Sequence, residues 1–184
     1  MNEKNLFILS SVAGGGKSTI IGMLLNAHKD LQFSISCTTR QIRNGEKEGI
    51  TYYYISIAEF EKKIQANEFL EWAKVHDNYY GTPKSPIYKS LEENRKMILD
   101  IDVQGFHKVK EIFPKSTSIF LLPPSIEIWV DRLKARNTET EESLHRRIEN
   151  GKKELKESGL FDYQIINDDL YKTFFEVERV IYPK

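Results

Sequence analysis

The feature that most constrains this chain is a glycine-rich run followed by a basic residue, Ser11-Val-Ala-Gly-Gly-Gly-Lys-Ser-Thr19. It stands between Leu6–Leu9, an apolar run that predicts a buried strand, and Ser18–Ala27, whose apolar residues recur at helical spacing. Glycines let backbone N–H groups turn inward around an anion, and a helix N-terminus adds positive potential. This strand–loop–helix context predicts a P-loop that binds nucleotide phosphates.

Within the loop, Lys17 is expected to reach the outer phosphates and the Ser18 hydroxyl to ligate Mg²⁺. The residues predicted to bind the triphosphate are Ala13, Gly14, Gly15, Gly16, Lys17, Ser18 and Thr19. The alternative interpretation is a glycine-rich turn that only caps the helix, and Gly-Lys-Ser-Thr after an apolar strand argues against it. Ser11 replaces the first glycine of the pattern; it costs about 1 kcal/mol or more if that position needs a positive φ, and nothing otherwise.

The rest of the chain alternates short apolar runs with longer amphipathic stretches. Buried strands are predicted at Met97–Ile101, Ser118–Leu122 and Tyr163–Ile166, which favours a parallel α/β sheet with helices on both faces. Residues 33–83, rich in Tyr, Thr and Ser, predict a small mixed-β insert, and the charged residues 125–157 predict a helical lid. We therefore predict one domain, 1–184, with a core (1–32, 84–124 and 158–184), an insert that binds the phosphate acceptor (33–83) and a lid (125–157).

Composition excludes several other classes of protein. The chain has 184 residues with 27 basic and 27 acidic side chains, and this zero net charge argues against a nucleic-acid-coating protein. No apolar run approaches the roughly 18 residues of a membrane span, and the N-terminal apolar segment is too short for a secretory signal. A single cysteine, Cys37, fits a reducing compartment. We expect a cytoplasmic protein without a membrane or nucleic-acid partner, as a monomer or weak homodimer.

Six of the eight arginines fall in two clusters. One cluster lies in the predicted insert and the other in the predicted lid: Arg40 and Arg43, then Arg132, Arg136, Arg146 and Arg147. Arginine suits bidentate phosphate contacts, so two clusters beside a P-loop suggest two phosphorylated ligands. The alternative for each arginine is a solvated position paired with nearby acids. The four histidines, His28, His76, His107 and His145, show no metal-ligand spacing.

Motifs over nearly the whole chain resemble the guanylate kinase family, in family order. They are Ser34–Arg43, Gly45–Tyr52, Asn67–Ala73, Asn78–Pro83, Leu99–Gly105, Arg136–Ser143 and Ile166–Leu170. The resemblance implies a nucleoside-monophosphate kinase fold and an ATP:GMP phosphotransferase that uses Mg²⁺. It implies catalytic roles for Lys17, Arg136 and Arg147. It also implies ATP contacts by Arg132 and by Asn167. Asn167 could in addition be a helix N-cap, and the two roles are compatible.

The resemblance also implies an acceptor site. It places the GMP phosphate on Arg40, Arg43, Tyr52 and Tyr80, and the guanine against Ser36, Glu71, Thr82 and Asp102, with Asp100 nearby. One carboxylate can accept from both N1–H and N2–H₂ of guanine, a donor pair that adenine lacks. Adenine would be rejected because the polar groups of the site would then lack hydrogen-bond partners.

Each acceptor-site residue also has a structural alternative. Glu71 could be a surface strand residue, the tyrosines could pack the insert, and the aspartates could cap a helix, with Asp100 alternatively orienting a magnesium water or a lid arginine. Two other functions stay open: a kinase for another monophosphate, and a noncatalytic module that binds phosphorylated peptides.

Overall fold

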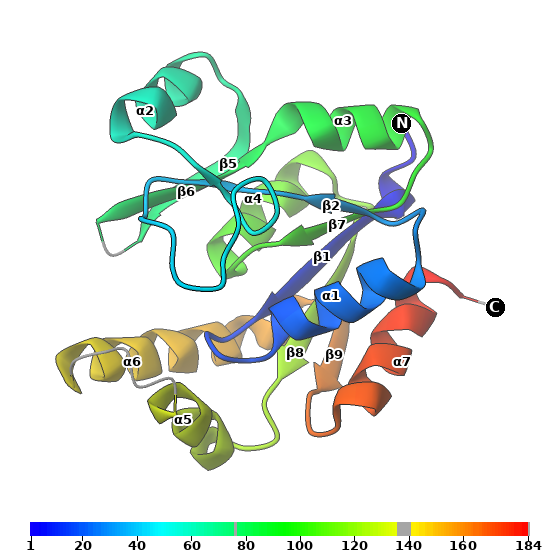
Figure 1. The fold of residues 1–184 in the computed structure, drawn as a ribbon. Helices are drawn as coiled ribbons and strands as arrows, with labels where there is room; N and C mark the ends of the chain where they lie inside the picture. Colours follow the sequence, from blue (N-terminus) through cyan, green and yellow to red (C-terminus); the bar gives the residue numbers. More distant parts are fainter. Residues whose placement is uncertain (76, 136–140, 184) are drawn as a thin grey trace. The chain divides into compact units, whose positions relative to one another are not determined.

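The computed structural model of the chain describes residues 1–75, 77–135 and 141–183. The strands are β1 (Leu6–Ser11), β2 (Gln32–Ser34), β3 (Cys37–Thr38), β4 (Tyr53–Tyr54), β5 (Phe69–Val75), β6 (Asn78–Pro83), β7 (Met97–Asp100), β8 (Thr117–Leu122) and β9 (Tyr163–Ile166) (Figure 1). The α-helices are α1 (Lys17–Ala27), α2 (Ile57–Gln65), α3 (Lys84–Glu92), α4 (Val103–Ile112), α5 (Ile126–Lys134), α6 (Glu141–Glu157) and α7 (Leu170–Ile181). Short 3₁₀ turns are η1 (Glu3–Asn5) and η2 (Ser158–Leu160).

Two sheets organise these elements. The larger has the strand order β2-β7-β1-β8-β9, and β1 with β8, β2 with β7, and β8 with β9 pair in parallel. The smaller has the order β4-β3-β6-β5 and is mixed, since β3 pairs with β4 in parallel and with β6 antiparallel. The predicted α/β class, with a parallel sheet and a small mixed sheet, is confirmed.

The chain forms two compact units. The first comprises Met1–Leu6, Asp30–Leu99 and Gln104–Ser116, and the second comprises Phe7–Lys29, Asp100–Val103 and Thr117–Lys184. The division into core, insert and lid stays a prediction. None of the described helices combines the length and the apolar character that crossing a bilayer requires.

The small sheet of the first unit is held by aromatic packing. Cys37, Phe60 and Phe69 form a buried cluster, and the Phe60 ring stacks on Phe69 with 4.4 Å between centroids. Gly81 of β6 lies against this stack, because a Cβ there would come within 2.9 Å of both phenyl rings. The cluster fixes β6 beside β5, and these two strands carry three of the candidate acceptor residues: Glu71, Tyr80 and Thr82.

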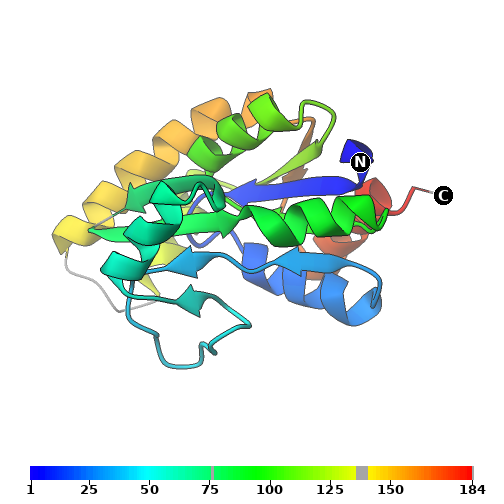
Figure 2. The same cartoon turned by 90° about the horizontal axis from the view of Figure 1, so that it is seen from above.

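In the second unit, α1 follows the buried strand β1 and packs against α7. The side chains of Ile20, Ile21 and Leu24 are buried, as the helical spacing of the apolar residues predicts. Figure 2 shows α1 and α6 on opposite sides of β1. Both faces of β1 are therefore covered, which explains why its six residues are all buried.

Candidate active site

The loop between β1 and α1 adopts backbone conformations that require glycine. Gly14 and Gly16 have φ of +79° and +93°, in the left-handed region that disfavours other L-residues. Gly15 is restricted by space, since a Cβ there would lie 2.6 Å from the Ser11 Oγ. Each of the three glycines therefore has a structural reason, and together they produce the tight turn that precedes α1.

Ser11 does not strain this loop. It is the last residue of β1 and pairs with Leu121 of β8, so its backbone is extended and needs no glycine. Its buried hydroxyl donates to the Val12 carbonyl at 2.9 Å and fills the space beside Gly15. Of the two possibilities that the sequence left open for Ser11, the harmless one is correct.

Lys17 begins α1, directly after the glycine loop. Its Nζ donates to the Ser11 carbonyl at 3.4 Å and forms an ion pair with Asp100 Oδ1 at 3.4 Å. Gly16 is the N-cap of α1 and has no side chain with which to cap it, which leaves the first N–H groups of the helix to be satisfied by other acceptors. A cationic side chain and a helix N-terminus thus converge on one loop, an arrangement suited to an anionic ligand.

The oxygen donors near Lys17 fit magnesium. Ser18 lies exposed in the first turn of α1, and the Asp100 carboxylate lies beside Lys17. Within the described ranges, no three His, Cys, Asp or Glu side chains gather as a metal cage. Mg²⁺ in nucleotide enzymes needs no such cage, because it takes one or two protein oxygens together with substrate phosphates and water.

Asn167 supports the P-loop from behind. Its buried side-chain Nδ2 donates to the Gly15 carbonyl at 2.7 Å. Arg132 of α5 donates through both terminal nitrogens to the Asn167 carbonyl at 3.3 Å. The N-cap interpretation of Asn167 is wrong, because Asp169 caps α7 by accepting from the Lys172 N–H at 2.8 Å. Arg132 and Asn167 are thus brought together beside the loop, and their ATP contacts stay predictions.

The remaining arginines of the predicted lid differ in their surroundings. Arg146 is exposed on α6 and lies 4.0 Å from Glu142, which fits a solvated ion pair. Arg147 is half-buried on the same helix. The catalytic role expected for Arg136 falls outside the described residues, as does most of the motif that begins with it.

A half-buried carboxyl on α6, Glu154, lies near the loop lysine. Burial raises the Glu154 pKa from its ordinary 4.5 to about 7, with the lowering effect of Lys17 outweighed by burial and by the negative charges of Asp102 and Glu157. Sequence reasoning did not single out Glu154, because one glutamate in a charged helix carries no distinguishing pattern.

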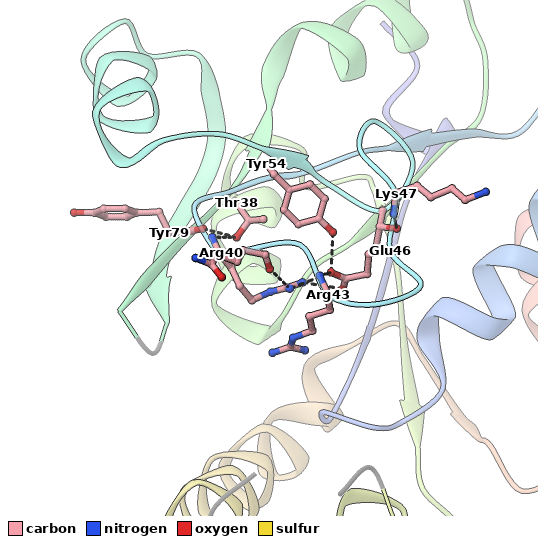
Figure 3. Close-up of polar contacts among 9 residues, drawn as sticks. Thr38, Arg40, Arg43, Glu46, Lys47, Tyr54 and Tyr79 are labelled. Atoms are coloured by element: carbon pink, nitrogen blue, oxygen red, sulfur yellow. Dashed lines mark hydrogen bonds and ion pairs between the residues drawn. The ribbon is translucent and has the colours of Figure 1, made fainter. Parts of the chain in front are cut away.

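In the first unit, Arg40 is held by a network centred on Glu46 (Figure 3). Its two terminal nitrogens donate to the two carboxylate oxygens of Glu46 at 3.0 and 2.8 Å. Burial works against the charged guanidinium, yet the hydrogen bonds with Glu46 outweigh this and raise the Arg40 pKa. The guanidinium also lies over the Tyr52 ring, 5.6 Å from its centroid. Arg40 is therefore a fixed, permanently charged group.

Glu46 accepts from two further donors. The Arg43 N–H and the Tyr54 hydroxyl both donate to Glu46 Oε2 at 2.8 Å. Although burial tends to raise the Glu46 pKa, these bonds and those from Arg40 lower it from the ordinary 4.5 to about 2. The Arg43 guanidinium points away from the Glu46 carboxylate (Figure 3). One carboxylate thus orients the backbone of one predicted phosphate-binding arginine and the side chain of the other.

The tyrosines predicted for the same phosphate lie together. The Tyr52 ring meets Tyr80 edge-on at 6.0 Å and Tyr54 edge-on at 6.0 Å. Tyr54 was not among the predicted residues, and neither was Glu46. Glu46 lies within the Gly45–Tyr52 motif and Tyr54 in the aromatic run after it, but their hydrogen bond follows only from the fold of this loop.

Three of the residues predicted to contact guanine form a polar chain in the first unit: Ser36, Glu71 and Thr82. Thr82 Oγ1 donates to Glu71 Oε1 at 2.5 Å, and Ser36 Oγ lies 3.5 Å from Thr82 Oγ1. Glu71 is 9% exposed and Thr82 is 1% exposed. They face each other across the antiparallel pair β5–β6, which gives both positions a fixed geometry. Glu71 is therefore not a surface strand residue. Asp102, also predicted to contact guanine, belongs to the second unit and is half-buried there.

The fold and the glycine loop with its lysine define an α/β protein of the P-loop nucleotide-binding class. A family model for guanylate kinase matches residues 3–184. The chain therefore belongs to the guanylate kinase family.

Individual relatives agree over almost the full chain. It is 45% identical to a guanylate kinase of Caldanaerobacter subterraneus subsp. tengcongensis over 96% of this chain and 85% of the relative. It is 43% identical to one of Prochlorococcus marinus subsp. pastoris over 98% of each chain. The crystal structure of guanylate kinase from Anaplasma phagocytophilum superimposes with a TM-score of 0.79, at 30% identity, over 96% of this chain and 83% of that one.

Proposed function

We propose that the chain transfers the γ-phosphoryl group of ATP to GMP and releases ADP and GDP, with Mg²⁺ as cofactor. The observation that carries the choice of acceptor is the buried Glu71–Thr82 pair, whose hydrogen bond is 2.5 Å long. The membership of the chain in the guanylate kinase family and the P-loop around Lys17 support the phosphotransfer. The reaction belongs to purine nucleotide metabolism, and the single cysteine fits a cytoplasmic enzyme.

The acceptor phosphate needs no general base. A GMP phosphate oxygen is already largely anionic at neutral pH, so catalysis reduces to positioning and charge neutralisation. Arg40 and Arg43 hold the acceptor phosphate in this proposal, with Tyr52 and Tyr80 beside it. Because Glu46 fixes the Arg40 guanidinium before any ligand arrives, little side-chain entropy is lost when the phosphate binds.

On the donor side, Lys17 neutralises charge on the outer phosphates of ATP. The Ser18 hydroxyl and, through water, Asp100 would hold Mg²⁺, which would supply Lewis-acid charge neutralisation there. Arg136 and Arg147 complete the neutralisation of the transferring group. In this proposal Arg132 and Asn167, which lie together beside the P-loop, contact ATP. Asp102 contacts the guanine of GMP.

The guanine edge selects the acceptor. The Glu71 carboxylate accepts from N1–H and N2–H₂, while the hydroxyls of Ser36 and Thr82 stand near O6. A base without that donor pair displaces water from the buried Glu71 carboxylate and gives no hydrogen bonds in return, which is costly. A kinase for another monophosphate is therefore disfavoured. A noncatalytic phosphopeptide module has no use for a P-loop lysine held between Ser11 and Asp100.

The test is a coupled ADP-release assay with ATP, Mg²⁺ and one monophosphate at a time. GMP should be phosphorylated at least roughly 10²-fold more efficiently than AMP or UMP, since a site that hydrogen-bonds the substrate strongly rejects analogues that lack those groups. Omission of Mg²⁺ should abolish turnover. Equal rates with GMP and AMP would refute the assignment of the acceptor, and the absence of ADP release with every monophosphate would refute the enzyme.

A further inference from the structure

The helix α6 contains a glycine that helix formation does not explain. Gly151 lies in the interior of a 17-residue helix. A glycine at such a position costs about 0.5–1 kcal/mol relative to alanine. The reason lies in its neighbour: a Cβ on Gly151 would come within 2.3 Å of Cζ2 and 2.4 Å of Cη2 of Trp129. The indole ring of α5 therefore sits directly against the backbone of α6.

The other edge of the same ring holds the P-loop. Trp129 Nε1 donates to the Ala13 carbonyl at 2.8 Å, and the side chain is fully buried. One helical turn further along α5, Leu133 packs toward Gly14, where a Cβ would lie 3.2 Å from Leu133 Cδ2. A peptide unit is planar, so fixing the Ala13 carbonyl also fixes the direction of the Gly14 N–H on the opposite side of that unit.

Gly151 shares its face of α6 with two charged side chains. Arg147 precedes it by four residues and Glu154 follows it by three, so all three lie along one stripe of the helix. The stripe faces the region of the P-loop, since Lys17 acts on the pKa of Glu154. The contact of Trp129 with Gly151 therefore helps to set the position of α6, and with it that of Arg147, relative to the P-loop.

We infer that Trp129 is a positioning residue for phosphoryl transfer, because it joins the backbone of the P-loop at Ala13 to α6 at Gly151. The indole contacts both the P-loop backbone and α6, the helix that carries Arg147. A shift of the loop or of α6 therefore moves the other. This inference rests on the proposed function, since it assigns Arg147 to the transferring phosphate. It concerns kcat rather than the binding of GMP, whose predicted contacts lie mainly in the first unit.

Three variants test this role against a purely structural one. Gly151→Ala forces the buried ring to move and should lower kcat about 10-fold or more, with KM for GMP unchanged within about twofold. Trp129→Phe removes the N–H donor and should lower kcat about 3- to 10-fold, the value of one neutral hydrogen bond. The double variant Trp129→Leu/Gly151→Ala replaces the indole by a smaller side chain and so leaves room for the methyl group added at position 151. Its melting temperature should therefore exceed that of Gly151→Ala, while kcat stays low.

Gly159→Ala is the matched control, because Gly159 follows α6 and a Cβ there has open space. It should retain wild-type kcat. A spectroscopic readout comes from the Trp72→Phe background, in which Trp129 is the one remaining tryptophan of the two in the sequence. Saturating ADP should change its emission, and GMP alone should not.

The outcomes separate the inference from the proposed function. If the wild-type protein does not phosphorylate GMP, the proposed function fails. If the wild type is active, wild-type kcat in Gly151→Ala or in the double variant would overturn the role of Trp129. An emission unchanged by ADP, or equal losses in kcat and in GMP affinity, would overturn it as well.

Discussion

Replacing Glu71 by glutamine is the sharpest test of guanine recognition. The substitution keeps the size of the side chain, but one carboxylate oxygen becomes an NH₂ group. Thr82 Oγ1 donates to Glu71 Oε1 at 2.5 Å, so glutamine must either offer its oxygen to Thr82 and turn NH₂ toward the guanine donors, or reverse the amide and lose the Thr82 donation. The first orientation places a donor against the guanine donors, and the second leaves one oxygen for both of them and makes Thr82 accept instead of donate.

The magnitude follows from the bonds lost. Hydrogen bonds to a charged group contribute about 1.5–3 kcal/mol each, and guanine offers two donors. We expect kcat/KM for GMP to fall on the order of 10²-fold or more, since about 1.4 kcal/mol is tenfold. Binding of ADP, measured by calorimetry, should not change. Glu68→Gln is the matched control, because Glu68 is half exposed and pairs with Lys63 at the surface.

A change in the substrate sharpens the assay. Inosine monophosphate lacks the N2 amino group, so wild-type enzyme should prefer GMP over it by about 10-fold or more, the value of one charged hydrogen bond. In Glu71→Gln this preference should shrink, and the four rates form a double-mutant cycle that isolates the contact. A preference that survives unchanged, or equal losses for GMP and ADP, would mean that Glu71 only supports the fold.

Three further changes test other parts of the site. Lys17→Ala should lower kcat at least roughly 10²-fold because a charge partner of the transferring phosphate is lost, whereas the exposed Lys29→Ala should not; wild-type turnover would refute the P-loop assignment. Glu46→Gln should raise KM for GMP and lower the melting temperature at pH 7. Since folding lowers the Glu46 pKa from 4.5 to about 2, that stabilisation is complete above pH 4.5 and is lost between pH 4.5 and 2, where the wild-type and variant melting curves should converge. Folding raises the Glu154 pKa from 4.5 to about 7, so the folded state loses stability as pH rises from 4.5 to 7. Glu154→Gln removes this cost and should raise the melting temperature by on the order of 10 °C above pH 7, and not at all below pH 4.5.

The sequence was sufficient for features that are local or that repeat with a regular period. The strand before the loop, the glycines and the helix after it are adjacent in the chain, and each follows from backbone preferences of single residues. The composition of residues 33–83 also indicated a small β insert, but not which of its strands pair in parallel. Glu71 required more, because its burial depends on β6 lying beside β5, and only the resemblance to a family indicated its role.

The sequence could not reveal partners that the fold brings together from distant positions. Glu46 and Tyr54 belong to the Arg40 network because a loop folds back on itself, and no spacing rule marks them. The status of Ser11 was undecided for a similar reason, since the outcome depended on whether β1 extends through that residue. Asp169, rather than Asn167, caps α7, and two neighbouring polar residues offered no local means of choosing between them.

The contacts of Asn167 show how a residue distant in the sequence orients the backbone of the P-loop. The Asn167 amide pins the Gly15 carbonyl, which fixes the following N–H, that of Gly16, on the opposite side of the same planar unit. Gly16 must lack a side chain for this to occur, because a Cβ there would lie 2.3 Å from Asn167 Nδ2. The direction of a loop amide is therefore set by a residue 152 positions away, before any phosphate binds. Donors that are oriented before the substrate binds contribute most to stabilising charge in a transition state. Asn167, which orients a loop amide, therefore supports catalysis as Lys17 does.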